Sequence, residues 1–334
     1  MSNYEISRLT EQELDEFREF CELHWGDRHP LIHNDEVFRY YYCRGDKINF
    51  LRARDTETGE LLSVIGFIPS NGLASPDVWI SYVLSKKGAP LNLGFHMVEK
   101  VCEITNCRAL GVNNVRKKVR GLYEFLGYSL VPFSHYYRLN GNKTDYSLCI
   151  PKERVIAPVF KSDAEFFRIN DEKELSCFDF ENYAQFTPFK DFDYFKHRFF
   201  ENPWIKYEVF GMLKDGVVLA LCVLRVLEHE GACVLRLVDF VGAREEFACV
   251  GGLLDRLIKE RNADFADVYV YGIGEEALNK AGFVLRKERD ESIIPDYLTP
   301  PLFENVDFYS VVDDTEKYLM FRADGDQDRP NMEA

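Results

Sequence analysis

The feature that most constrains the fold of this chain is an internal repeat. The segment Leu122–Tyr128 matches Ala277–Phe283 at an offset of 155 residues, and two further pairs of apolar segments precede these in the same order at nearly the same offset. Such self-similarity indicates a duplicated unit. The 334 residues therefore predict two domains, residues 1–150 and residues 151–334.

Each copy predicts an α/β unit. In the first, strand Val78–Ser85 precedes helix Leu93–Thr105, whose apolar residues recur at helical spacing, and strand Ala109–Val112 follows. A helix over Arg116–Leu126 then ends before Gly127, a residue favoured just after helix C-termini. The second copy has the same order, with elements expected at Val234–Val241, Val250–Arg261, Asp267–Tyr271 and Glu275–Ala281.

Composition excludes several functional classes. With 41 basic and 56 acidic residues the net charge is −15, which argues against a binder of nucleic-acid phosphates. The apolar runs are shorter than the roughly 20 residues that a membrane helix needs, and the first residues lack a signal-peptide pattern, so we expect a cytoplasmic protein. The nine cysteines form no C-x-x-C pair and the seven histidines no ligand spacing, so no metal is expected.

The order of strand, turn, helix and strand, followed by the helix that carries Leu122-Tyr-Glu-Phe-Leu-Gly-Tyr128, resembles the GNAT acyltransferase superfamily. The resemblance implies two GNAT-like domains, each a mixed, splayed β-sheet flanked by helices. Tandem chains of this length are similar to FemABX-type aminoacyl transferases and to N-acyltransferases acting on nucleotide-linked amino sugars. The tail Phe321–Asn331 resembles C-termini from bacterial polysaccharide gene clusters, which implies a role in surface-glycan biosynthesis.

The resemblance implies acyl-CoA as donor, either acetyl-CoA or a short-chain acyl-CoA such as a hydroxyacyl-CoA. Its pyrophosphate would bind the turn before helix Leu93–Thr105, since a helix N-terminus attracts anions. The turn meets the family's glycine pattern only in part, and an ordinary exposed loop is the alternative. In the second copy the equivalent turn carries Glu245 and Glu246, which would repel a pyrophosphate. The residues expected to bind the donor are Val83, Leu84, Ser85, Lys86, Lys87, Gly88, Leu91, Asn92, Leu93, Gly94 and Asn114.

Two groups of the first copy are implied in catalysis. Tyr123 matches the family tyrosine that protonates the departing thiolate, whereas the second copy has Leu278 at that position. The backbone N–H of Leu84 would polarise the thioester carbonyl. A tyrosine that only packs the helix onto the sheet is the alternative for Tyr123. The first domain is therefore expected to be catalytic, and the second to be degenerate and to serve as an acceptor wall or as structural support.

The acceptor is expected to be a small-molecule amine, for which we favour a dTDP- or UDP-linked amino sugar. The first copy offers Trp25 for stacking on a ring, Arg28 for a phosphate, and His29 and His33 as polar groups; a surface or capping role is the alternative for each histidine. The second copy offers Tyr297 from a proline-rich loop. A FemABX-like enzyme and a non-catalytic GNAT-fold binding protein remain alternatives, and the oligomeric state, a homo-oligomer included, stays open.

Overall fold

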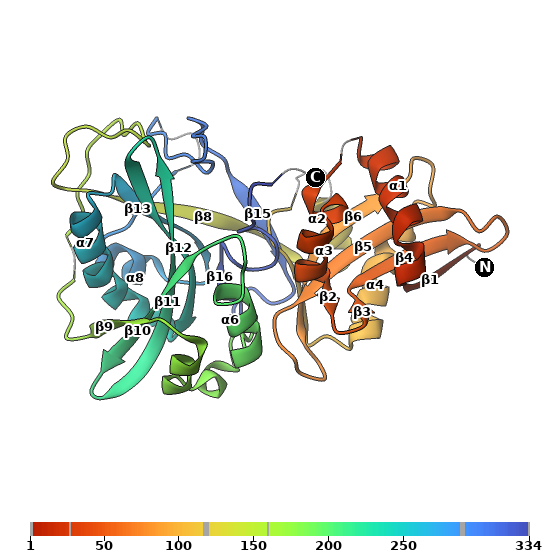
Figure 1. The fold of residues 1–334 in the computed structure, drawn as a ribbon, viewed down its shortest axis with the longest axis horizontal. Coiled ribbons are helices and arrows are strands. Elements are labelled where there is room, and N and C mark those ends of the chain that lie inside the picture. The colour runs from red at the N-terminus through yellow and green to blue at the C-terminus, as the bar shows by residue number, and fades with distance from the viewer. Residues whose placement is uncertain (1–2, 27, 116–119, 159, 288–290, 333–334) are drawn as a thin grey trace. The chain divides into compact units, whose positions relative to one another are not determined.

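The computed structural model describes residues 3–26, 28–115, 120–158, 160–287 and 291–332, which form two compact units (Figure 1). Unit 1 comprises Met1–Leu130, Val311–Asp313 and Gly325–Ala334, and unit 2 comprises Val131–Ser310 and Asp314–Asp324. The boundary therefore differs from the predicted one at residue 150. The reason is that β8 (Ser129–Leu139) is one long strand that pairs with β13 (Phe265–Tyr271) of unit 2.

Unit 1 contains a mixed sheet in the order β1-β4-β5-β6-β7, antiparallel except for the parallel pair β6–β7. Its strands are β1 (Tyr4–Arg8), β4 (Phe50–Asp55), β5 (Leu61–Pro69), β6 (Asp77–Ser85) and β7 (Ala109–Val112), with a small hairpin of β2 (Cys43–Arg44) and β3 (Lys47–Ile48). Its helices are α1 (Leu14–Trp25), α2 (Pro30–His33), α3 (Asp35–Tyr42), α4 (Leu93–Thr105) and α5 (Arg120–Phe125).

Helices cover both faces of this sheet, with α1 and α3 in front and α4 behind in Figure 1. On the front face Phe17 of α1 and Phe38 of α3 pack on Phe50, and all three rings are fully buried. Helix α4 buries Met97 and Val101 and returns the chain from β6 to the parallel strand β7. This βαβ crossover places the ends of β6 and β7 at the same edge of the sheet.

Unit 2 repeats this plan with the sheet order β9-β10-β11-β12-β13-β8, in which β12 and β13 are parallel. Its large core packs α7 and α8 against this sheet, and a second cluster lies beneath α6. Its elements are β9 (Glu165–Ile169), α6 (Phe192–Phe199), β10 (Tyr207–Lys214), β11 (Val217–His229), β12 (Ala232–Gly242), α7 (Val250–Arg261), α8 (Glu275–Lys280), β14 (Val284–Leu285) and β16 (Met320–Phe321). Strand β15 (Phe308–Val312) begins in unit 2 and ends in unit 1, where Val311 pairs with Val112.

The two units share their strand register. Ser63 pairs with Ser85 in unit 1, and Ala220 pairs with Gly242 in unit 2, which gives an offset of 157 residues for both strands. Each long strand also carries a β-bulge at the same place, at Ser81 of β6 and at Val238 of β12. The structure thus confirms two α/β domains with mixed sheets flanked by helices. Within the described residues, no helix is long and apolar enough to cross a membrane.

Candidate active site

The candidate site of unit 1 lies where two parallel strands part. Strands β6 and β7 are in register as far as Ile80 and Val112; β7 then ends, while β6 continues to Ser85. A pocket of about 750 Å³ opens beside this gap. We call the gap between the strands, together with this pocket, the unit 1 notch. The lining residues, all from unit 1, are His24, Trp25, His29, Leu31, Ile80, Ser81, Tyr82, Val83, Leu84, Ser85, Val112, Asn114, Val115, Leu122, Tyr123, Asp326, Gln327 and Arg329.

The bulge at Ser81 decides which backbone groups of β6 face the notch. The N–H of Lys86 donates to the carbonyl oxygen of Leu62 on β5, at 3.0 Å. Because strand residues alternate in direction, the N–H of Leu84 also points towards β5, and those of Val83 and Ser85 point to the opposite side. The N–H of Leu84, the expected oxyanion donor, therefore faces β5 and not the notch, and the N–H groups of Val83 and Ser85 are the ones directed away from β5. The extra residue of the bulge shifts the alternation by one position, and the sequence pattern gave no sign of it.

Tyr123 lies on the wall of the notch, in α5. Its side chain is 3% exposed, and burial raises the pKa of its hydroxyl, which therefore stays protonated at neutral pH. A protonated phenol is the form that can give a proton to a thiolate. The first residues predicted for this helix, 116–119, lie outside the described residues.

The turn that leads into α4 offers backbone N–H groups. Asn92 caps the helix without a side-chain hydrogen bond, and no acidic residue lies in the first turn. Gly88 has a φ of +88°, a conformation that L-residues rarely adopt. Lys86 is engaged by Glu60, with 2.5 Å between Nζ and Oε2, whereas Leu91 is fully exposed. Of the residues expected to bind the donor, Val83–Ser85 and Asn114 line the notch, and the remainder, 86–94, form this adjoining turn and the start of α4.

The residues expected to bind the acceptor separate into two groups. Trp25 and His29 line the notch, where the Trp25 ring stacks on Tyr82 with centroids 5.1 Å apart. Arg28 is exposed and is not among the lining residues. The side chain of His33 is only 2% exposed and is hydrogen-bonded to the backbone of Arg18 and His29. It therefore holds α2 in place and does not line the notch.

The last predicted acceptor residue, Tyr297, is 56% exposed and belongs to unit 2. Sequence reasoning missed a set of lining residues in a segment that returns to unit 1 after residue 324. This return segment, residues 325–332, contributes Asp326, Gln327 and Arg329 to the notch. The amide of Asn114, expected to contact the donor, instead donates to Oε1 of Gln327 at 3.0 Å.

The equivalent notch of unit 2 is filled by the chain itself. Strands β12 and β13 are in register as far as Leu237 and Val268 and then part. Residues 319–324, which we call the plug segment, enter this gap: Phe321 pairs with Val270 of β13, and the N–H of Ala323 donates to Val238 of β12 at 2.8 Å. Gly272, with a φ of +94°, makes room for the approach, since a Cβ there would collide with the carbonyl oxygen of Tyr318.

A carboxylate also occupies the backbone donor of the unit 2 notch. Phe240 is the counterpart of Val83 at the shared offset, and its N–H donates to Oδ1 of Asp239 at 2.7 Å. Asp239 is fully buried and is held by Nζ of Lys190 at 2.5 Å, which also contacts Asp324 of the plug segment at 3.0 Å. The N–H that could stabilise an oxyanion in this unit is therefore already used.

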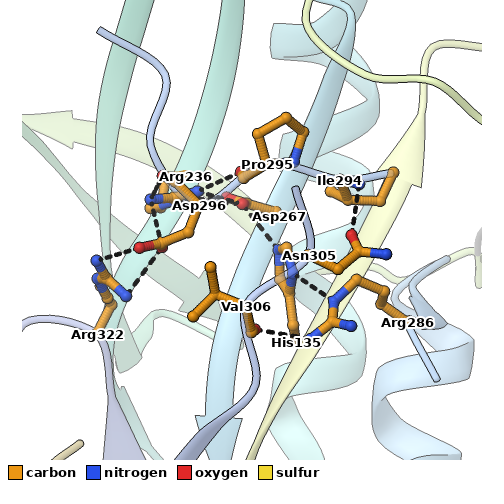
Figure 2. Close-up of polar contacts among 10 residues, drawn as sticks. All are labelled: His135, Arg236, Asp267, Arg286, Ile294, Pro295, Asp296, Asn305, Val306 and Arg322. Carbon is orange, nitrogen blue, oxygen red and sulfur yellow. Dashed lines mark hydrogen bonds and ion pairs between the residues drawn. The ribbon is translucent and has the colours of Figure 1, made fainter. Parts of the chain in front are cut away.

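A second ionic network, in unit 2, holds the end of the plug segment (Figure 2). Arg322 donates hydrogen bonds to the carboxylate of Asp296, which also forms an ion pair with Arg236 of β12. Arg236 in turn binds Asp267, which is bonded to His135. Burial lowers the pKa of His135, so the imidazole is held neutral between charged neighbours. Because these groups satisfy one another, we interpret the network as structural.

The fold is shared with solved acyltransferase structures. One is a GCN5-related N-acetyltransferase from Anabaena variabilis, with a TM-score of 0.58 and 9% sequence identity over 92% of this chain and 72% of that one. Another is a conserved protein from Enterococcus faecalis described as a probable N-acyltransferase, with a TM-score of 0.54 and 10% identity over 94% of this chain and 73% of that one. No family model and no curated protein matches the sequence. The GNAT-like fold expected from the sequence is confirmed at the level of structure.

Proposed function

We propose that this chain is an acyl-CoA-dependent N-acyltransferase with one active site, in the unit 1 notch. One observation carries the proposal: the notch of unit 1 is open and has Tyr123 on its wall, whereas the same notch in unit 2 is filled by the plug segment. The likeness in fold to N-acyltransferases supports the reaction class.

In the proposed reaction the pyrophosphate of the donor binds the turn over residues 86–94 and the N-terminus of α4, where helix N–H groups and the helix dipole favour an anion. The thioester lies along the open edge of β6, and the N–H of Val83 or Ser85 stabilises the oxyanion of the tetrahedral intermediate. Tyr123 then protonates the departing thiolate. This chemistry needs no metal ion.

For the acceptor we propose the amine of a dTDP- or UDP-linked amino sugar. The aromatic wall of Trp25 and Tyr82 suits the face of a ring, and His29 adds a polar group beside it. Arg28 is proposed only as an outer contact with the nucleotide. A non-catalytic GNAT-fold binding protein is the second candidate, which the Lys86–Glu60 ion pair favours because a lysine held by Glu60 is less available to the phosphates of a reacting donor.

The test is an acyl-transfer screen on the full chain. Acetyl-CoA and several short acyl-CoAs are combined with a panel of UDP- and dTDP-linked amino sugars, with free glucosamine and with a short peptide bearing a free N-terminus. Thiol release and the mass of the acylated product are followed. Acceptor-dependent release with an amino sugar supports the proposal in full, and product on the peptide alone corrects the acceptor. Binding of acyl-CoA without turnover favours the second candidate, and neither binding nor turnover refutes both.

A further inference from the structure

The return segment is fixed within unit 1 by contacts on either side of the notch. The amide of Asn114, next to β7, donates to Gln327, and the hydroxyl of Tyr41 on α3 donates to the backbone oxygen of Asp328 at 3.4 Å. These bonds fix the two residues that directly follow Asp326, whose own side chain is among those that line the notch. The segment is therefore part of the built wall of the pocket.

Asp326 brings a buried carboxylate to the wall of the notch. The residue is 4% exposed, and it is the one acidic side chain among the described residues that line the notch. Its Oδ2 accepts from Nη1 of Arg329 at 2.7 Å, and its Oδ1 accepts from the amide of Gln327 at 2.9 Å. A carboxylate offers about four lone-pair positions, so these bonds orient the group and leave it able to accept more.

Asp326 interacts electrostatically with a hydroxyl group that contacts the bulge of β6. Burial raises the pKa of Tyr42, the negative charge of Asp326 raises it further, and the positive charge of Arg329 lowers it, so both members of this ion pair act on that hydroxyl. The same hydroxyl is 2.6 Å from Oγ of Ser81, the bulged residue. The backbone donors proposed for the oxyanion, Val83 and Ser85, follow directly along the strand.

We propose that Asp326 binds the ammonium group of the acceptor in the unit 1 notch and takes its proton, and that Arg329 and Gln327 hold the carboxylate in position. The inference rests on the proposed acyl transfer and identifies the acceptor group as a cationic primary amine. A buried carboxylate favours such a cation over a hydroxyl or a second anion.

Two protons leave the acceptor nitrogen in the course of the proposed reaction. The ammonium gives one proton to the Asp326 carboxylate, and its lone pair forms the new C–N bond at the thioester carbon. Collapse of the intermediate breaks the C–S bond, and the thiolate takes a proton from Tyr123. The amine nitrogen loses its second proton, which restores Tyr123, and Asp326 releases its proton to water. The sum is one amide, one thiol and one proton from one ammonium and one thioester.

The test compares Asp326→Asn with Asp46→Asn, the loss of an exposed carboxylate elsewhere in unit 1. Wild-type transfer from acetyl-CoA to whichever amine the screen identifies is measured first, since its absence refutes the proposed function and not the role of Asp326. In Asp326→Asn, kcat/KM for the amine is expected to fall about 100-fold at pH 7, with acetyl-CoA affinity and Tm retained. Asp46→Asn should behave as wild type.

A pH series separates proton transfer from packing. Below the pKa of the amine, Asp326→Asn should gain about tenfold in kcat/KM for each pH unit, because only the free amine can react. Wild type should be flatter, because the ammonium brings the proton that Asp326 removes. The titratable and charged groups near Asp326 are Arg329, Tyr42 and the lining residues His24, His29, Tyr82 and Tyr123. Equal rates in wild type and Asp326→Asn, parallel pH slopes, or a joint loss of Tm and acetyl-CoA affinity would overturn the inference.

Discussion

The notches of the two units lie beside strands with the same register and the same bulge, but the unit 1 notch is open and the unit 2 notch is filled by the chain. In unit 1 the edge of β6 beyond Ile80 borders an open pocket, whereas in unit 2 the plug segment pairs with β13 and bonds to β12. The backbone donor beyond the bulge is directed to the pocket at Val83 and is bonded to a carboxylate at Phe240. Two copies of one scaffold can thus keep the fold while only one keeps room for a substrate.

The difference also gives the second copy a physical role. Residues 319–324 are buried in unit 2 and tied by Lys190 and Asp296, and the chain then continues as the return segment of unit 1. We therefore interpret unit 2 as the anchor of the segment that carries Asp326. This role requires no second active site.

The largest expected effect concerns the acid of unit 1. Tyr123→Phe should lower kcat by about 10²–10⁴-fold while acetyl-CoA affinity and Tm change little, because the ring still packs but cannot protonate the thiolate. Leu278→Ala, at the matching position of unit 2, should destabilise that unit, because Leu278 is buried, but should not change the rate per folded molecule. Steady-state kinetics and thermal melts check both. The matched control is Tyr128→Phe, and a Tyr123→Phe rate equal to that of this control would show that the acid is wrongly assigned.

The next effect concerns the plug. Lys190→Met removes the cation that faces Asp239 and Asp324 and should lower the free energy of unfolding by about 3–5 kcal/mol at pH 7. Burial raises the pKa of Asp239 to about 6, so the folded chain binds more protons than the unfolded chain between about pH 4 and pH 6. Stability from this group therefore falls as pH rises through that window.

Without Lys190 the pKa of Asp239 should rise further, so the deficit of Lys190→Met should be smaller at pH 5 than at pH 7. Denaturant unfolding at the two pH values checks the sign. Adding Asp239→Asn should recover part of the loss, because one uncompensated buried charge is removed. A deficit that is the same at both pH values and in the double variant would mean that the lysine acts through packing alone.

The smallest effect is a difference in thiol reactivity. In unit 1 a hydrogen bond from Cys107 lowers the pKa of Cys102 to about 7, whereas burial raises the pKa of Cys177 and Cys222 in unit 2. Iodoacetamide at pH 7.5 should therefore label Cys102 several-fold faster than Cys177, although Cys177 is the more exposed, and the advantage should shrink as the pH is raised, because Cys177 then ionises as well. Peptide mass spectrometry measures the order, and faster labelling of Cys177 would contradict it.

Local patterns predicted most of the scaffold. The helix Leu93–Thr105, the strand Ala109–Val112 and the helix Val250–Arg261 have the bounds expected from hydrophobic periodicity, because each buries one face against its own sheet. The helix over Asp35–Tyr42 was not anticipated, although its N-cap Asn34 and its buried Val37 and Tyr41 follow the usual rules.

The candidate site was less predictable. Tyr123 was proposed from the resemblance of Leu122–Tyr128 to the GNAT motif, and the repeat sets it against Leu278. The bulge at Ser81 was missed because one extra residue in a strand leaves no mark on an apolar run. Asp326 was missed because it reaches unit 1 from more than 200 residues beyond the notch strands, and no local pattern encodes such a contact.

If only the unit 1 notch accepts the donor, each chain binds one coenzyme A, and calorimetric titration of the chain with coenzyme A measures this number. Gly94→Asp places a negative charge at the start of α4, where a Cβ would meet Leu122 only at 3.7 Å; Gly252→Asp does the same at the start of α7, where the space is open. We expect one site per chain, weakened at least tenfold in Gly94→Asp and unchanged in Gly252→Asp. Two equal sites, or a site weakened only by Gly252→Asp, would contradict the account.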